Sequence, residues 1–170
     1  MRRQQTTVKA VEYFLKEKVE SMEEVANVSE FIHFCCTSED INNLSYALCL
    51  EEARANIILP TMKELISKIN NNANEYSDIP MLARTHGQPA TPSTLGKEFS
   101  NFVYRLNRQY EQFEKVEILG KNNGAVGNFN AHMVVYPNID WSTVSKDFIE
   151  NSLNLTFNPY TTQIAPHDFC

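Results

Sequence analysis

Residues 41–76 of this chain read INNLSYALCLEEARANIILPTMKELISKINNNANEY, and this stretch decides the fold class. Its apolar side chains recur at steps of three and four residues from Ile41 to Tyr76, which is the pattern of one face of an α-helix. A helix of about thirty-five residues would be about 50 Å long, more than the width of a compact domain of this size. The stretch therefore needs long partner helices and predicts an all-α, long-helix bundle. Pro60 is expected to kink the helix.

A second long stripe follows further along the chain. Its apolar residues are again spaced by three or four: Leu95, Phe99, Phe102, Val103, Leu106, Tyr110, Phe113 and Val116. Charged residues fall on the outer faces between them. This spacing predicts a second long helix, which could pack antiparallel against the first.

Three shorter helices are expected around these two. Residues 8–18 form a short amphipathic pattern with Glu12 and Lys16 on its outer side, and residues 28–36 are apolar nearly all round, which predicts a buried helix. A further helix is predicted over residues 140–153, with Asp140 as its cap. From residue 158 onward the chain is polar and irregular.

The polar loop between the two stripes reads Arg84-Thr85-His86-Gly87-Gln88-Pro89-Ala90-Thr91-Pro92. His86 lies between hydrogen-bonding neighbours, and an imidazole exchanges protons near neutral pH, so it is a candidate proton donor or acceptor. Thr91 followed by Pro92 predicts a helix start, whose N-terminus would favour an anion beside His86. An incidental histidine beside a capped helix explains the loop alone equally well.

Two other loops carry polar or glycine patterns. Thr37-Ser38-Glu39-Asp40 matches a helix capping box, and taken alone it favours a cap over a binding site. Residues 120–128 space three glycines through a polar loop but lack the order of a nucleotide-binding motif. These glycines are expected to let the backbone turn and approach another segment closely.

Composition excludes several classes of function. The 170 residues suit one domain, with 42% hydrophobic and 21% charged residues, and no apolar run approaches the ~20 residues of a membrane-spanning helix. A net charge of −6 argues against a nucleic-acid partner. The four cysteines lack C-x-x-C spacing, so we expect neither disulfides nor a zinc site. A reducing, cytoplasmic location is expected instead.

Taken together, these motifs closely resemble the adenylosuccinate lyases of the fumarase and aspartase superfamily. The resemblance rests on the loops at 37–40, 84–92 and 124–128 and on Asn158-Pro159-Tyr160-Thr161-Thr162-Gln163, with Val8-Lys9-Ala10-Val11-Glu12-Tyr13-Phe14-Leu15-Lys16 and Ser29-Glu30-Phe31-Ile32-His33-Phe34 resembling the bacterial-type subgroup. It implies a β-elimination that releases fumarate from adenylosuccinate, giving AMP, and from the succinyl-carboxamide intermediate of purine biosynthesis. It also implies a homotetramer that needs no metal or cofactor.

The resemblance assigns roles to six residues. His86 would be the general acid, with Thr85 and Gln88 around the substrate. Thr37 and Ser38 would hold a substrate carboxylate or phosphate, and Gln163 would hydrogen-bond the substrate.

The sequence departs from the family in two places. The family's catalytic serine lies on a Gly-Ser-Ser-x-Met-Pro loop, which these 170 residues do not contain, and Gln5-Thr6-Thr7 stands where the family carries Asn-His-Asp. We therefore expect an internal fragment, inactive alone. Residues 1–26 would end the N-terminal domain, and residues 27–170 would be the first half of the central helical-bundle domain.

Two alternative functions stay open at this point. The chain could be a non-catalytic helical scaffold or oligomerisation fragment that keeps the helices and has lost the chemistry. It could also belong to a sibling fumarate-releasing lyase, although the subgroup-specific residues at 8–16 and 158–163 disfavour this.

Overall fold

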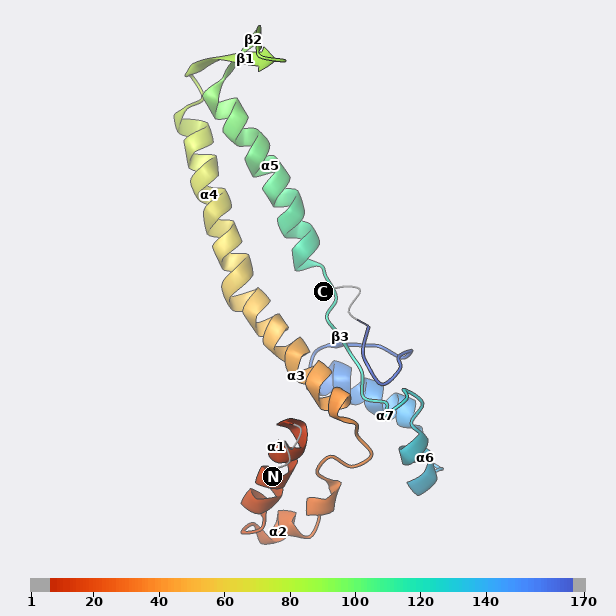
Figure 1. Ribbon diagram of the computed structural model, residues 1–170. Helices are drawn as coiled ribbons and strands as arrows, with labels where there is room; N and C mark the ends of the chain where they lie inside the picture. The colour runs from red at the N-terminus through yellow and green to blue at the C-terminus, as the bar shows by residue number, and fades with distance from the viewer. Residues whose placement is uncertain (1–6, 167–170) are drawn as a thin grey trace, which may run out of the picture. The chain divides into compact units, whose positions relative to one another are not determined.

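The computed structural model describes residues 7–166 and is mostly helical (Figure 1). It divides into two compact units: the described residues up to Leu50 together with those from Glu117 onward, and residues Glu51–Val116. Gln5 and Thr6, two of the residues that stand in place of the family's Asn-His-Asp, lie outside the described range. A division into compact units differs from a domain boundary, so the boundary expected after residue 26 stays a prediction.

The long helix predicted from residue 41 is present in three consecutive segments. These are α3 (Ser38–Ala53), the π-helical segment η2 (Arg54–Ile58) and α4 (Leu59–Glu75). Pro60 has no N–H to continue an α-helical ladder, and just before it the Leu59 N–H donates to the Arg54 carbonyl, five residues back. The disturbance that Pro60 brings thus takes the form of a π-helical segment.

Within the second unit, α5 (Leu95–Glu114) runs antiparallel beside α4, as predicted (Figure 1). The two helices approach closely at Gly96, where an added Cβ atom would lie 2.3 Å from the Ala73 carbonyl oxygen. The rings of Tyr76 and Phe99 pack nearby, with centroids 6.0 Å apart. Only a side chain as small as hydrogen allows this approach.

The loop between these helices is a β-hairpin, which corrects the prediction that Thr91 and Pro92 begin a helix. Strands β1 (Pro80–Thr85) and β2 (Gln88–Thr94) pair antiparallel, and Pro92 lies opposite Leu82. The two-residue turn, His86 and Gly87, has φ values of 49° and 76°, as in the type I′ turns that close hairpins tightly. This turn returns the chain as a strand, so helix α5 begins only after Thr94.

Thr94 is the true cap of α5. Its Oγ1 accepts a hydrogen bond of 3.2 Å from the Lys97 N–H. The helix N-terminus that we expected beside His86 is therefore displaced to the far end of β2.

The first unit contains the remaining elements. They are α1 (Thr7–Val19), α2 (Glu23–Ala26), η1 (Ser29–Phe31), most of α3, β3 (Leu119–Gly120), α6 (Asn130–Val135), α7 (Trp141–Asp147), η3 (Phe148–Ser152) and β4 (Thr156–Phe157). Its core consists of Leu44, Ala47, Ile149 and Leu155, with Ile118, Leu153 and Phe157 packed against them. Strands β3 and β4 pair in parallel. Asp140 caps α7, as predicted, by accepting from the Thr143 N–H.

The prediction of a buried helix over residues 28–36 is wrong. Only Ser29–Phe31 is helical, as one 3₁₀ turn, because His33 and Cys35 adopt left-handed backbone conformations with φ values of 66° and 57° that end a helix.

Helix α1 also turns a different face inward from the one that its pattern predicted. Glu12 is buried and pairs with Lys9, Lys16 and His33, while Val11 and Leu15 are exposed. The ion pairs of Glu12 decide which face is covered.

Candidate active site

Three of the predicted substrate-binding residues come together in the first unit. Thr37 lies directly before α3, and Ser38 is the first residue of that helix. Gln163 lies in the segment after β4, and its Nε2 donates a hydrogen bond of 3.2 Å to Thr37 Oγ1. The structure therefore brings a hydroxyl, a carboxamide and a helix N-terminus to one place, a combination suited to an anionic ligand.

The predicted capping box is half formed. The Thr37 N–H donates to Asp40 Oδ2 over 2.8 Å, which is the reciprocal bond of a capping box. The Asp40 N–H instead bonds the Thr37 main-chain carbonyl. The Thr37 hydroxyl is consequently not used for capping and is available to Gln163.

A fully buried ion pair lies next to these residues in the interior of the first unit. Lys121 Nζ lies 2.8 Å from Asp40 Oδ1, and both side chains have no exposed surface. The same carboxylate accepts hydrogen bonds from the Asn123 and Gly124 N–H groups, and Lys121 Nζ also donates to the Gly124 carbonyl. A buried charge pair is stable only when its remaining bonding capacity is used in this way.

Two asparagines extend this network. The Asn43 side chain bonds both the N–H and the carbonyl of Lys121, at 2.8 and 2.9 Å. The Asn123 side chain bonds the Thr161 hydroxyl at 2.8 Å. The network therefore joins three parts of the chain: the start of α3, the glycine loop (residues 120–128) and the segment that carries Gln163.

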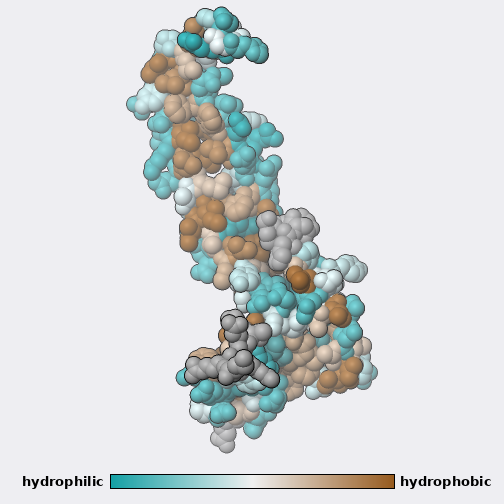
Figure 2. All heavy atoms as spheres, in the orientation of Figure 1, coloured by the Kyte–Doolittle hydropathy of each residue, from teal (hydrophilic) through white to brown (hydrophobic). Residues whose placement is uncertain are grey.

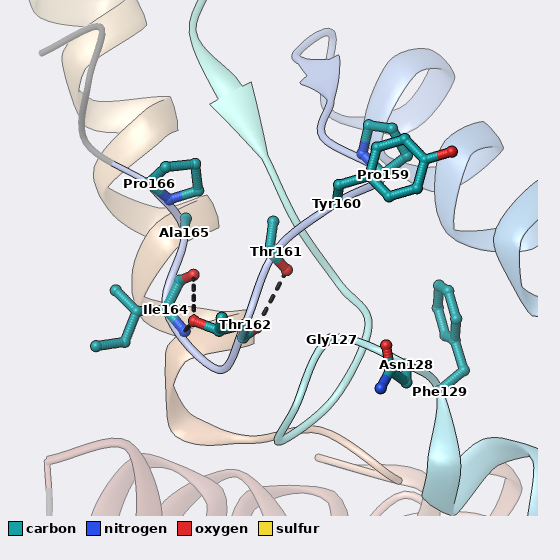
Figure 3. A pocket seen from close by; sticks show the side chains of 10 residues that line it. All are labelled: Gly127, Asn128, Phe129, Pro159, Tyr160, Thr161, Thr162, Ile164, Ala165 and Pro166. Atoms are coloured by element: carbon teal, nitrogen blue, oxygen red, sulfur yellow. Dashed lines mark hydrogen bonds between the residues drawn. The ribbon is translucent and has the colours of Figure 1, made fainter.

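The glycine loop approaches this last segment closely, as its sequence predicted. At Gly127, which has a φ of 80°, an added Cβ atom would lie 2.2 Å from the Thr161 carbonyl oxygen. The same two segments line a shallow groove of about 880 Å³ (Figure 3). Its lining residues are Gly127, Asn128, Phe129, Pro159, Tyr160, Thr161, Thr162, Ile164, Ala165 and Pro166.

Burial shifts the pKa values of two titratable side chains beside the network toward their neutral forms. Burial raises the pKa of the Cys36 thiol to about 11, and the nearby Asp40 carboxylate adds to this. Burial lowers the pKa of His132, against the smaller opposing effect of Asp40. His132 Nδ1 is buried without a hydrogen-bond partner.

The other three predicted residues lie at the tip of the hairpin in the second unit. Thr85 and Gln88 face each other across the last pair of the ladder, and His86 forms the turn between them. All three are exposed. The hairpin thus groups the candidate acid with its two expected neighbours, while Thr37, Ser38 and Gln163 form a separate group in the first unit.

Sequence reasoning missed the roles of Asp40, Lys121 and Asn123. The sequence pattern predicts only a capping role for Asp40, and it predicts no role for the lysine of the glycine loop. The signal in the sequence is a lysine within a loop rich in glycine and asparagine. Such a loop offers few apolar neighbours to the aliphatic part of a lysine, which indicates a polar partner for its amino group. Its partner, far away in the sequence, carried no signal.

Among residues 7–166 we find no group of three or more histidine, cysteine or acidic side chains placed to hold a metal ion. Over the same range, no helix is both long and apolar enough to cross a membrane.

Comparisons with known proteins identify the family of this chain. The family described as "Lyase" matches residues 2–170, and the chain therefore belongs to this lyase family. It is 62% identical over 162 residues to the adenylosuccinate lyases of Vibrio cholerae and Escherichia coli K12, covering 95% of this chain and 36% and 35% of those proteins. The chain spans about a third of the length of these curated relatives.

Solved structures show the same fold at low sequence identity. A 3-carboxy-cis,cis-muconate lactonizing enzyme from Pseudomonas putida matches with a TM-score of 0.70 and 23% identity, covering 89% of this chain and 32% of that one. A β-carboxy-cis,cis-muconate cycloisomerase from Acinetobacter calcoaceticus matches with a TM-score of 0.72 and 21% identity, covering 88% and 33%. Together with the family match, these structures confirm the predicted fold class, an all-α, long-helix bundle that is partial here.

Proposed function

We propose that this chain is part of an adenylosuccinate lyase, which cleaves adenylosuccinate to AMP and fumarate and acts likewise on the succinyl-carboxamide intermediate of purine biosynthesis. The observation that carries this proposal is the 62% identity, over 95% of the chain, to proteins of that name. This identity also disfavours a sibling fumarate-releasing lyase. The meeting of Thr37 with Gln163, 126 residues apart, supports a substrate site rather than a scaffold that has lost its chemistry.

The reaction needs two proton transfers and a site for anionic groups. A base removes a proton from Cβ, the neighbour of the carbon that carries the leaving nitrogen. An acid protonates that nitrogen as the C–N bond breaks. His86 is the proposed acid, because the hairpin tip presents its imidazole with Thr85 and Gln88 beside it. The proposed base is the family's serine, which lies outside these 170 residues, so we expect the chain alone to be inactive.

The second group would hold the substrate. The hydroxyls of Thr37 and Ser38 and the free N–H groups at the start of α3 suit a carboxylate or phosphate. The Gln163 carboxamide, which already reaches the Thr37 hydroxyl, would bond a further polar group of the substrate. No cofactor enters this scheme.

The complete protein is proposed to be a cytoplasmic homotetramer whose only ligands are small molecules. Much of the apolar surface of α3 and α5 is exposed, including Tyr46, Leu48, Phe102 and Tyr104, and Figure 2 shows apolar side chains on the visible face of the α4–α5 pair. Apolar side chains gathered on an exposed face are typical of a protein interface.

The direct test is a chimera in which the 162 matched residues of this chain replace the segment that they match in the Escherichia coli adenylosuccinate lyase. Turnover of adenylosuccinate, followed by ultraviolet absorbance, is the expected result. A folded, assembled chimera with no turnover would overturn the proposal. The parent enzyme, purified alongside, provides the reference rate.

A further inference from the structure

We propose that Asp40 is a positioning residue, which holds Thr37 and the segment carrying Gln163 in the geometry that binds substrate. This inference rests on the proposed function for its ligand. Its structural part rests on the hydrogen bonds and the ion pair of this network alone.

The first step concerns the bonds of one carboxylate. Asp40 Oδ2 accepts from the Thr37 N–H at 2.8 Å and from the Gly124 N–H at 3.2 Å, and Oδ1 accepts from the Asn123 N–H at 3.1 Å. Every one of these donors is a main-chain group. Asp40 therefore fixes the backbone at the start of α3 relative to the backbone of the glycine loop.

The second step concerns the counter-charge. A carboxylate with no exposed surface is costly unless it is paired, and Lys121 Nζ supplies the pair at 2.8 Å. Lys121 is itself fixed, because its main chain bonds the Asn43 side chain on α3 through both the N–H and the carbonyl. The ion pair is thus built into the connection between α3 and the glycine loop.

The third step extends the connection to Gln163. Asn123, whose N–H bonds Asp40, donates from its side-chain Nδ2 to the Thr161 hydroxyl at 2.8 Å. Two residues further on, Gln163 donates to Thr37 Oγ1. These hydrogen bonds link Thr37 to Asp40, Asp40 to Asn123, and Asn123 to Thr161. The main chain leads from Thr161 to Gln163, whose bond to Thr37 closes the ring, which we call the circuit.

Such a circuit orders both ligand-contacting side chains before a ligand arrives, which lowers the entropic cost of binding. Weakening it should therefore weaken substrate binding more than it slows the chemical step, which depends on the proton donor in the hairpin. The expected signature is a higher KM at nearly constant kcat.

The test uses Thr161→Val in the chimera, because this change removes one hydroxyl of the circuit and keeps the side-chain shape. We expect KM to rise about three- to tenfold, the effect of losing one hydrogen bond, with kcat within about twofold of the parent. Thr143→Val is the matched control: its hydroxyl also makes a 2.8 Å bond, to Asp140, at the exposed start of α7. The control should leave both constants unchanged.

Amide hydrogen exchange gives a second readout that needs no activity. In Thr161→Val, the amides of residues 123–129 and 161–165 should exchange faster, and in Thr143→Val they should not. Asp40→Asn should show a larger effect of the same kind, because it removes the charge and places a donor against main-chain N–H groups; if it does not fold, Thr161→Val still decides.

Each remaining outcome contradicts some part of the account. Unchanged exchange in Thr161→Val overturns the circuit, whether or not the chimera turns over. Faster exchange with an unchanged KM overturns the positioning role, and a raised KM without faster exchange would mean that Thr161 contacts the substrate itself. A folded parent chimera with no turnover would overturn the proposed function and with it the positioning role toward that substrate.

Discussion

Gln163 Nε2 donates a hydrogen bond of 3.2 Å to Thr37 Oγ1, although the two residues are 126 positions apart in the sequence. The bond involves exposed groups, so it contributes little to stability because water competes for both partners. The same two groups are therefore free to exchange partners when a ligand arrives. This contact places two proposed ligand-binding groups together at the start of α3.

Replacing Gln163 should affect binding rather than folding. In the active chimera, Gln163→Ala is expected to raise KM about tenfold, the cost of one hydrogen bond to a charged or strongly polar group, with an unchanged melting temperature. Steady-state kinetics and thermal unfolding measure the two quantities. Gln109→Ala, an exposed glutamine on α5, is the control; an equal rise in KM for both variants would contradict a specific role.

The long helices could be predicted from the sequence, and the hairpin between them could not. Helical periodicity over residues 41–76 and 95–116 is a local signal, and α3, α4 and α5 follow it. The hairpin depends on a His86–Gly87 turn, whereas the usual signal for such a turn is Asn-Gly or Asp-Gly. Thr91 and Pro92 offered a stronger but misleading helix-start signal, because prolines also occur in edge strands.

The candidate site was predictable only in part, for a related reason. The resemblance pointed to Thr37 and Gln163, and the structure brings them together. The Asp40–Lys121 pair that holds their surroundings depends on a tertiary contact between α3 and a loop far along the chain. The pattern of α1 also predicts an outward-facing Glu12, whereas the side chain is buried and pairs with His33 of a later segment as well as with Lys9 and Lys16.

The packing of α4 on α5 should be sensitive to a single methyl group. Gly96→Ala is expected to lower the free energy of unfolding by about 3 kcal/mol, because its Cβ would meet main-chain atoms of Ala73 and Ser77, which cannot move aside. Denaturant unfolding measures the change. Gly87→Ala meets no atom within 4 Å but has a φ of 76°, so backbone strain alone should cost about 1 kcal/mol. Equal losses in the two variants would contradict the close approach.

The cysteines should differ in reactivity. Burial raises the pKa of Cys36 to about 11, so at pH 8 only about one thiol in a thousand is ionised. Cys49 is exposed. Brief treatment with iodoacetamide, followed by peptide mass spectrometry, should label Cys49 before Cys36, and the labelling of Cys36 should keep increasing with pH up to about 11. Equal labelling in urea is the control, and equally fast labelling in the folded protein would contradict the burial of Cys36.

The exposed apolar side chains of α3 and α5 predict self-association of the isolated chain. Phe102 and Tyr104 are more than half exposed on α5, as is Tyr46 on α3, and monomers rarely present large contiguous apolar surface to water. Light scattering at micromolar concentration should therefore give a mass above that of one chain. A well-folded monomer at that concentration would contradict this prediction.

The measurement that tests the central claim most directly is the turnover of adenylosuccinate by the chimera with and without His86. His86→Gln should lower kcat by about two to four orders of magnitude, the usual contribution of a positioned proton donor. Its assembly and melting temperature should stay unchanged, because the side chain is exposed at a hairpin tip. A His86→Gln chimera that turns over adenylosuccinate as fast as its parent would contradict the account.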